Sequence, residues 1–445
     1  MERLILNEVM RTPLSVSLPI LRSLASPLTG IVPFTQQLLP TTDDARLFHV
    51  ASITGDSSEV IGSASNRYNG GINFTYDGAW AAAIGEGLER YAGAYLEEDR
   101  IRFATANELG EAAAAPESFA LFHDLQYAQA DFPYARFTAD TRVRWTPAYR
   151  LPGGARAYVP TQLTSLAAPP HGEPRLGYAT SSGHACGATL EEAILSGLLE
   201  LVERDAFVLT WYNGLSLPRV DYADDAALWS EDRRYYAPTR LRYQTFDLSA
   251  FHNIPTALGV VRDDFGPVAM AVGCASAPTM HDAVRKALRE AFQTRAFARL
   301  LRADRPDWSC ESFETVEDFE DHVLYYAFPE AAKQAAFIDG SHQRVSVGDV
   351  ANLEGASVTA HIGAILARLA ARGVNVYVVE TTPPDLRTAG LRTAVVVAPE
   401  LSRLDVPYRY RYFGGKRLYH ASSDVGLVPR VLTPDDLNPL PHPFP

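Results

Sequence analysis

Cysteines and long apolar runs are both scarce in this chain. Its 445 residues include three cysteines, Cys186, Cys274 and Cys310. They are too few and too scattered for a disulfide framework or a zinc site. No apolar run approaches the roughly 18 residues that a membrane-spanning helix needs, and the N-terminus has no clean signal-peptide core. We therefore predict a cytoplasmic protein that has no membrane partner.

Positive charge is in deficit as well. Lysine and arginine total 40 against 53 aspartates and glutamates, which gives a net charge of −13 and argues against a nucleic-acid partner. The sequence also lacks a Walker-type phosphate loop, a kinase-type glycine loop and a dinucleotide fingerprint. The chain is nevertheless 47% hydrophobic and 21% charged, which is normal for a globular protein with a sizeable core.

The spacing of apolar residues predicts a mixed α/β protein of the α+β class. Long helices are expected over residues 78–97, 189–211, 280–301 and 357–373. Asp77 and Thr189 are expected to cap the first two helices, and Gly373 to end the last one. Runs of β-branched and apolar residues, such as RYQTFDL, TALGVV and VNVYVVE, predict strands.

Glutamates recur on three of these helices at spacings that place them on shared faces. Glu86 and Glu89 are three residues apart, and so are Glu200 and Glu203. Glu192 extends the second row, while Glu290 follows Lys286 by four residues on the third helix. Because the flanking residues are apolar, these helices are expected to be largely buried. A buried carboxylate is unfavourable unless it is paired or bound to a metal ion.

Two interpretations of these glutamates follow from the residues alone. Each one can pair with an arginine or lysine, or point to solvent, and Glu192 can belong to a capping box with Thr189. Alternatively, the carboxylates converge on magnesium ions that also bind phosphate, and nearby arginines hold phosphate oxygens. That second arrangement is typical of phosphoryl transfer.

Four stretches resemble, in order, the motifs of the YcaO-domain family. They are AAAIGEGLERYAG (81–93), SSGHACGATLEEAILSGLLELVERDAF (181–207), ALREAFQTR (287–295) and LRTAVVVAPELSRLDVPYRYRYFGGKRL (391–418). The resemblance implies a YcaO fold, with antiparallel sheets packed by long helices around a buried ATP site. It implies Mg2+ ligands at Glu86, Glu89, Glu192, Glu200, Glu203 and Glu290. It also implies nucleotide contacts at Arg90, Arg204, Lys286 and Gln293.

The last five residues, PHPFP, resemble the end of YcaO enzymes that form azolines, the cyclodehydratase D subunits of thiazole/oxazole-modified microcin biosynthesis. In those relatives a Cys, Ser or Thr side chain attacks the preceding amide carbonyl. The resulting oxygen is phosphorylated by ATP and leaves as phosphate. The resemblance implies that Pro441, Pro443 and Pro445 form a stiff tail reaching the active site, with the Pro445 carboxylate as a base or orienting group. Composition alone predicts a disordered end.

The resemblance also implies a domain organisation and partners. We expect an N-terminal segment over 1–65, an ATP-binding catalytic domain over 66–430 and the tail over 431–445. The substrate is expected to be a precursor peptide. Because the chain starts close to the YcaO region, we expect its leader to be bound in trans by a partner resembling ubiquitin-activating enzymes. A homodimer within a larger complex and a separate flavin-dependent azoline dehydrogenase are expected too.

Some positions depart from the family pattern and leave other functions open. Lys286 stands where an arginine is frequent and cannot form the same bidentate fork with phosphate. Ser182, Ala83 and Ala188 replace other common residues. The alternatives are a YcaO enzyme that forms a thioamide or a macrocyclic amidine, and a YcaO scaffold without catalysis. A further alternative is a structural protein whose glutamates only form ion pairs.

Overall fold

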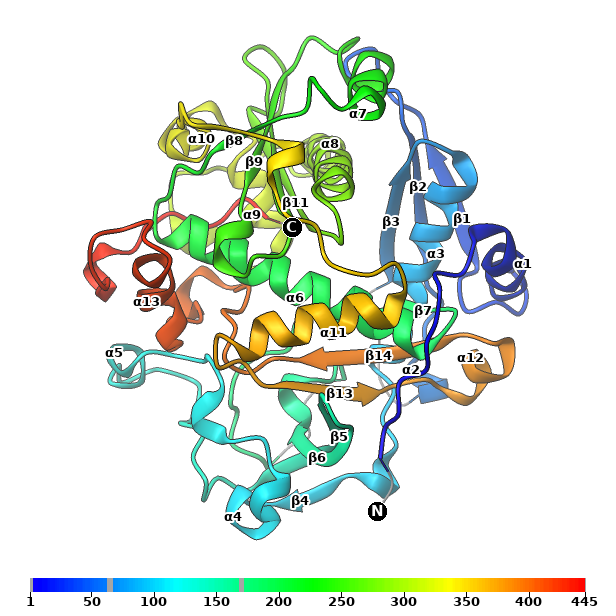
Figure 1. The fold of residues 1–445 in the computed structure, drawn as a ribbon, viewed down its shortest axis with the longest axis vertical. Helices are drawn as coiled ribbons and strands as arrows, with labels where there is room; N and C mark the ends of the chain where they lie inside the picture. The colour runs from blue at the N-terminus through cyan, green and yellow to red at the C-terminus, as the bar shows by residue number, and fades with distance from the viewer. Residues whose placement is uncertain (1–2, 62–66, 168–171, 445) are drawn as a thin grey trace. The chain divides into compact units, whose positions relative to one another are not determined.

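The computed structural model describes residues 3–61, 67–167 and 172–444, and the chain divides into two compact units. Unit 1 comprises Met1–Leu38, Phe48–Leu201 and Glu354–Leu401. Unit 2 comprises Leu39–Leu47, Val202–Leu353 and Ser402–Pro445. The chain therefore enters each unit more than once, and helix α6 (Leu190–Tyr212) contributes its first half to unit 1 and its second half to unit 2 (Figure 1).

Unit 1 contains two antiparallel sheets. The smaller sheet has the order β1 (Phe34–Leu38), β2 (Phe48–Ile53) and β3 (Tyr68–Asn73). The larger one has the order β4–β5–β13–β14–β7, with β6 on β5. Its strands are β4 (Arg102–Ala104), β5 (Val143–Leu151), β6 (Ala155–Pro160), β7 (His184–Gly187), β13 (Val376–Glu380) and β14 (Arg392–Val397).

The principal helix of unit 1 is α3 (Tyr76–Gly93), which packs on β2 and β3. The prediction that Asp77 caps this helix is wrong. Thr75 is the N-cap, because its extended backbone places its hydroxyl 3.2 Å from the Gly78 amide. Asp77 lies in the first turn instead. The other helices are α1 (Leu14–Leu24), α2 (Ser58–Ile61), α4 (Ala106–Leu109), α5 (Asp124–Tyr127), α11 (Val358–Ala370) and α12 (Pro384–Ala389).

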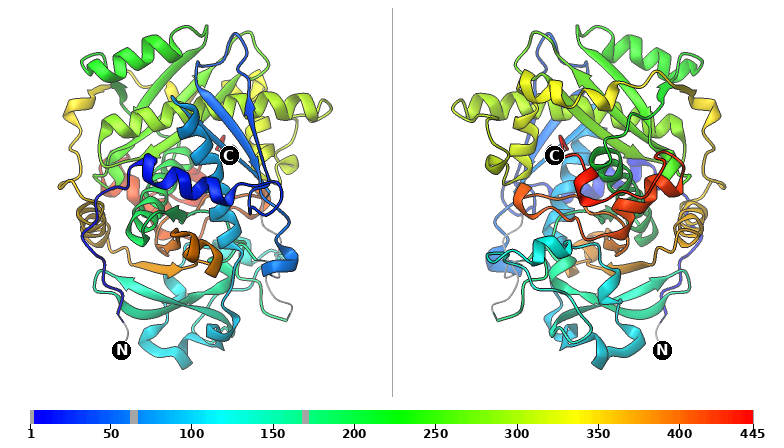
Figure 2. Two further views of the ribbon diagram at one scale, coloured as in Figure 1. Left: turned by 90° about the vertical axis from the view of Figure 1, so that its right-hand side faces the viewer. Right: turned by 90° about the vertical axis from the view of Figure 1, so that its left-hand side faces the viewer.

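Unit 2 is built on a five-stranded sheet of order β11–β10–β9–β8–β12, in which only β8 and β12 pair in parallel among the described strands. The strands are β8 (Arg219–Asp221), β9 (Arg242–Asp247), β10 (Thr256–Arg262), β11 (Met270–Ser276) and β12 (Arg344–Ser346). Helix α8 (Met280–Asp304) packs along β10 and β11, and the helix and strands lie together in every view (Figures 1 and 2).

An aromatic core fills unit 2. It joins the second half of α6 to the sheet and to the end of the chain, and Phe207, Trp211, Phe246, Tyr326 and Phe444 are among its buried members. The remaining helices of the unit are α7 (Ala226–Glu231), α9 (Phe319–Tyr325), α10 (Pro329–Gln334) and α13 (Lys416–Asp424). No helix in the described part of the chain combines the length and hydropathy needed to cross a bilayer.

Two glycines let the glutamate-bearing helices approach their sheets closely. A Cβ atom on Gly71 of β3 would lie 2.2 Å from the Ala79 carbonyl oxygen of α3. A Cβ atom on Gly273 of β11 would lie 2.3 Å from the Ala291 amide nitrogen of α8. Both clashes are with helix backbone, which cannot rotate away as a side chain can. These glycines therefore fix the distance between each helix and its sheet.

We expect Gly273→Ala to destabilise the protein by about 1–3 kcal/mol, since it overpacks a close helix–sheet contact. Urea unfolding followed by circular dichroism measures the change. Gly363→Ala is the control. Gly363 lies within α11, where an added Cβ meets no described atom within 4 Å. That variant should be more stable by about 0.5–1 kcal/mol, because alanine is the better helix former. Equal effects in both variants would contradict the role given to Gly273.

Candidate active site

In unit 1, α3 and the first half of α6 carry a group of carboxylates around one arginine. Glu86 accepts a hydrogen bond from the Gly70 amide (2.8 Å) and pairs with Arg90 Nη2 (2.8 Å). Glu200 accepts a hydrogen bond from the Gly183 amide (3.0 Å). Two of the predicted ligands are thus held in place by backbone N–H groups of neighbouring segments.

The raised pKa of Arg90 indicates that three of the predicted ligands lie near its guanidinium. Burial by itself lowers the pKa of Arg90. The negative charges of Glu86, Glu89 and Glu200 outweigh burial, so the pKa is raised above its usual value. Three carboxylates thus share one guanidinium in this group. Nε and Nη2 of Arg90 both donate to Glu86 Oε1, and this ion pair also matches the simpler interpretation made from the sequence, in which the glutamates pair with arginines.

Cys186 lies beside this group, and its environment disfavours the thiolate form. Burial, and then the negative charge of Glu89, raise the pKa of its thiol to about 12. The thiol therefore stays protonated at neutral pH, and only a thiolate is strongly nucleophilic.

His184 on β7 gives the unit a specific pH response. Burial, and then the charge of Arg90, lower the pKa of His184 from 6.5 to about 4. Below pH 6.5 the unfolded chain therefore binds a proton at His184 that the folded chain does not bind. The free energy of unfolding falls as the pH drops towards 4. At pH 5 this residue should remove about 2 kcal/mol of stability.

We expect His184→Gln to lose less stability than wild type between pH 7 and pH 5. Urea unfolding at both pH values measures this, and comparison with wild type cancels the titration of other groups. A variant that loses as much stability as wild type would contradict the assignment.

Glu192 occupies a different environment from the other ligands predicted in unit 1. Its carboxylate accepts hydrogen bonds from the amides of Thr12 and Ala188, and its own amide donates to the Thr189 hydroxyl (3.2 Å). Thr189 therefore caps α6 as predicted. The return bond of a capping box goes one residue earlier than expected, to Ala188. Glu192 also fastens the N-terminal segment, a role that the sequence did not reveal.

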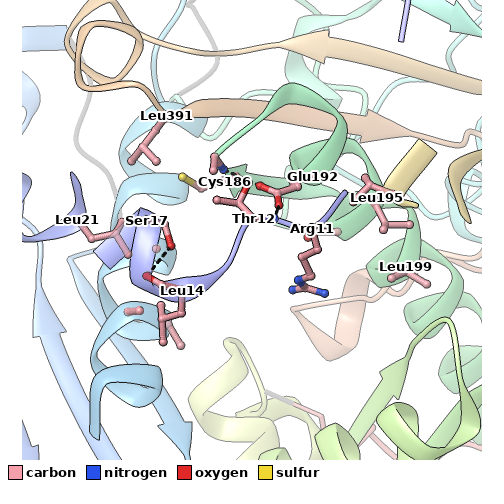
Figure 3. Close-up of a pocket in the computed structure, with 17 residues that line it drawn as sticks. Arg11, Thr12, Leu14, Ser17, Leu21, Cys186, Glu192, Leu195, Leu199 and Leu391 are labelled. Carbon is pink, nitrogen blue, oxygen red and sulfur yellow. Dashed lines mark hydrogen bonds between the residues drawn. The ribbon is translucent and has the colours of Figure 1, made fainter. Parts of the chain in front are cut away.

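A cavity of about 360 Å³ lies beside Glu192 in unit 1. Arg11 and Ser17 from the N-terminal part of the chain line it (Figure 3). Gly85 of α3 and Ser196 of α6 line it as well. Arg11 and Ser17 are not among the site residues predicted from the sequence. Nothing in their local pattern marks them, because the segment is positioned through backbone contacts such as Thr12 N–H to Glu192.

In unit 2, the second half of α6 faces α8 through a second charged group. Glu203 is 3% exposed and accepts a hydrogen bond from the Ser276 amide (3.3 Å). Lys286 Nζ lies 3.4 Å from both Glu203 Oε2 and Glu290 Oε1. Arg204 Nε lies 3.9 Å from Glu203 Oε1. Four predicted site residues are therefore brought together here.

Within this group, the pKa of Glu290 is shifted upward. Burial raises its pKa, and the charge of Glu203 adds to the increase, although Lys286 and Arg204 act against it. The balance puts the pKa of Glu290 at about 7. The carboxylate is therefore poorly compensated by the protein's own cations and would be stabilised by a divalent ion.

Gln293 and Arg295 are the other polar residues of this α8 motif. Gln293 lies three residues beyond Glu290 on α8 and is half-buried. Arg295 is 3% exposed and pairs with Asp44 (2.9 Å) and Asp263 (2.7 Å). These ion pairs give Arg295 a structural role within unit 2.

The end of the chain is docked in unit 2 rather than extended into solvent. Pro441, Pro443 and Phe444 are buried. The Phe444 ring lies 4.8 Å from the Phe207 ring, and the Arg204 guanidinium lies over it at 4.2 Å. Among the three tail prolines proposed as catalytic, Pro445 lies outside the described residues. The structure thus brings the tail to the residue after Glu203.

Residues 70–402 match the family described as YcaO cyclodehydratase, ATP- and Mg2+-binding. The match covers well over half of the chain, so the chain belongs to the YcaO cyclodehydratase family. The resemblance found in its motifs, the predicted fold of antiparallel sheets and long helices, and ATP and Mg2+ as the family's cofactors are confirmed.

Individual relatives support this membership. A heterocyclase solved in complex with substrate and cofactor has a TM-score of 0.82, and the heterocyclase TruD has a TM-score of 0.72. Both are 25% identical, and both comparisons cover 100% of this chain but 59% and 56% of theirs. An uncharacterised protein in the tfuA 3′ region of Rhizobium leguminosarum bv. trifolii is 29% identical over 287 residues, covering 61% of this chain and 64% of the relative. The chain therefore spans less than two thirds of each relative's length.

Proposed function

We propose that the chain is an ATP-dependent cyclodehydratase. It would convert Cys, Ser or Thr residues of a ribosomally made precursor peptide into thiazolines or oxazolines, as in the biosynthesis of peptide antibiotics. One observation carries the proposal. In unit 2, Glu203 belongs to a buried charged group with Lys286 and Glu290, and the next residue, Arg204, lies against the docked tail residue Phe444.

The residues present fit Mg2+. Carboxylate oxygens are its preferred protein ligands. In unit 1, three carboxylates share Arg90, and in unit 2 the raised pKa of Glu290 marks an under-compensated charge. We assign Glu86, Glu89, Glu192, Glu200, Glu203 and Glu290 as the residues that hold Mg2+. When bound, Mg2+ neutralises phosphate charge in phosphoryl transfer.

The basic and amide side chains supply contacts to the nucleotide. Arg90, Arg204 and Lys286 would donate to phosphate oxygens, and Gln293 offers an amide. We assign the nucleoside to the unit 1 cavity, because its walls combine small residues with polar Ser17, Ser196 and Arg11. The N-terminal segment would then form one side of the nucleotide site.

The proposed reaction also requires a group that removes or orients a proton, and we assign this role to the tail. The side chain of Cys, Ser or Thr attacks the preceding amide carbon, and the amide oxygen takes the terminal phosphoryl group of ATP. That oxygen leaves as phosphate when the azoline double bond forms, so ATP yields ADP and phosphate. We propose that Pro441 and Pro443 stiffen the tail, and that the Pro445 carboxylate removes or orients a proton.

A precursor peptide of this kind needs its leader held as well as its reacting residue. We propose that a separate leader-binding protein resembling ubiquitin-activating enzymes delivers it. A flavin-dependent dehydrogenase would act afterwards if azoles are formed, and the complex would contain a homodimer of this chain.

Calorimetry of ATP binding in Mg2+ provides the first test. We expect wild type to bind and Glu200→Gln to lose binding, because the variant removes a carboxylate that faces Arg90. Glu354→Gln is the matched control, since Glu354 pairs with Arg368 and its side chain is 79% exposed. Loss of binding in both variants would point to a general charge effect rather than a site.

Mass spectrometry of a precursor peptide provides the second test. With ATP, Mg2+ and a candidate leader-binding protein, each ring should remove the mass of one water molecule. Mass unchanged by any such combination, despite ATP binding, would contradict cyclodehydration. A gain of sulfur instead would favour the thioamide alternative.

A further inference from the structure

The tail is held by a dedicated set of buried donors in unit 2. Three successive tail carbonyls each lie within hydrogen-bond distance of a buried aromatic side chain. The pairs are Trp211 Nε1 to the Leu440 oxygen (3.0 Å), the Tyr326 hydroxyl to the Pro441 oxygen (2.5 Å) and His322 Nδ1 to the His442 oxygen (2.7 Å). A proline-rich chain has few amides to offer, so its carbonyls are the groups by which it can be gripped.

His322 contacts the tail both through its ring face and through a ring nitrogen. Its side chain is fully buried, and its ring stacks on the His442 ring at 3.9 Å with an angle of 7° between the planes. Its second nitrogen, Nε2, lies 2.7 Å from the Val406 carbonyl oxygen. His322 therefore joins the tail to the segment that follows Asp405.

His442 is fixed from both sides of its own ring. Nε2 lies 2.9 Å from the Asp405 carbonyl oxygen, and Nδ1 accepts a hydrogen bond from the Phe444 amide (3.2 Å). The ring is therefore neutral, with its hydrogen on Nε2. A neutral His322 ring has one N–H, so it donates a hydrogen bond to the carbonyl oxygen of either His442 or Val406 and only contacts the other. The two histidines and Asp405 are close enough for a metal site, but the Asp405 carboxylate accepts hydrogen bonds from the Tyr212 hydroxyl.

We propose that His322 and His442 form a pair that positions the tail and thereby fixes Phe444 against Arg204. His442 orients the Phe444 amide, and the Phe444 ring lies under the Arg204 guanidinium at 4.2 Å. His322 is thus a positioning residue that acts through the tail. Its importance for catalysis rests on the function proposed above, whereas its grip on the tail does not.

Hydrogen–deuterium exchange of the full-length chain tests the grip directly. We compare the C-terminal peptide in wild type, His322→Ala, His442→Ala and the double variant. Each single variant should raise exchange at the tail amides at least tenfold. The double variant should exchange no faster than the faster single variant, because both substitutions break the same contact between His322 and His442.

His252→Ala is the matched control. His252 is also a buried histidine of unit 2, and it pairs with Asp205 at 2.7 Å rather than with the tail. It should leave tail exchange within twofold of wild type. Additive effects of the two tail-pair variants, unchanged exchange, or equal loosening in His252→Ala would each overturn the pair. If His322→Ala does not fold, His322→Phe keeps the ring volume and the stack but removes both nitrogens, and it should loosen the tail equally.

Activity separates this inference from the proposed function. In an active enzyme, His322→Ala should lower the turnover number for cyclisation at least tenfold, with ATP affinity little changed. Wild type that never cyclises a peptide, but whose tail loosens as described, contradicts the proposed function and leaves the histidine pair intact. If wild type cyclises a peptide but His322→Ala does not change exchange at the tail amides, the result contradicts the pair alone.

Discussion

Glu203→Gln should abolish ATP consumption while the chain remains folded. The side chain is 3% exposed, and its amide replacement keeps the volume and an acceptor for the Ser276 amide (3.3 Å). What disappears is the negative charge beside Lys286 and Glu290. Removing one charge-stabilising group from a preorganised site typically lowers turnover by about 10²–10³-fold, and loss of a metal ligand adds to that. Phosphate release measured with saturating ATP and peptide shows the effect.

Glu231→Gln is the control for this variant. Glu231 also pairs with a basic residue of α8, because it lies 2.6 Å from Arg285, the neighbour of Lys286. The control therefore loses one carboxylate and one ion pair on the same helix without altering the proposed site. It should consume ATP at nearly the wild-type rate. Near-normal turnover in Glu203→Gln would rule out the magnesium-binding role of the glutamate group.

Removal of residues 443–445 should have the second largest effect. The deletion takes away Phe444, which covers Phe207 and Arg204, and the terminal carboxylate proposed as a base. Misplacement of a reacting group can reduce a rate by about 10²-fold, and we expect at least that loss of cyclisation. The rest of the aromatic core remains, so circular dichroism should show a folded protein.

Pro439→Ala serves as the control for the deletion. Pro439 is exposed, and its carbonyl, which alanine retains, accepts hydrogen bonds from Tyr408 and Arg411. This variant should cyclise peptide normally. A truncated enzyme with full activity would show that the docked tail serves only to complete the core.

The long helices could be predicted from the sequence because their signals are local. Thr189 caps α6 through a residue three positions away, and the apolar spacing of 280–301 lies within α8. The start of α3 was harder to predict. Thr75 and Asp77 are both good capping residues, and only the backbone conformation decides between them.

Other parts of the candidate site had no local signal. His322 meets His442 across 120 positions of sequence, and Arg11 reaches its cavity because a backbone amide next to it binds Glu192. Backbone hydrogen bonds depend on position rather than residue type, so composition and spacing do not encode them. The glutamates, by contrast, were found because several carboxylates in apolar helices are unusual for any globular protein.

The interleaved order of segments has a consequence for how the chain folds during synthesis. Strand β7 leads directly into α6, yet its partner in the described sheet is β14, which spans Arg392–Val397. Strand β5 pairs early with β4 and β6, but its residues 149–151 pair with β13, which comes much later in the chain. The pairings with β13 and β14 therefore form only after most of the polypeptide has left the ribosome. Such long-range pairings are slow to form and leave strand edges exposed meanwhile. The nascent chain should therefore depend strongly on chaperones, and its yield should respond to them more than that of a protein with locally paired strands.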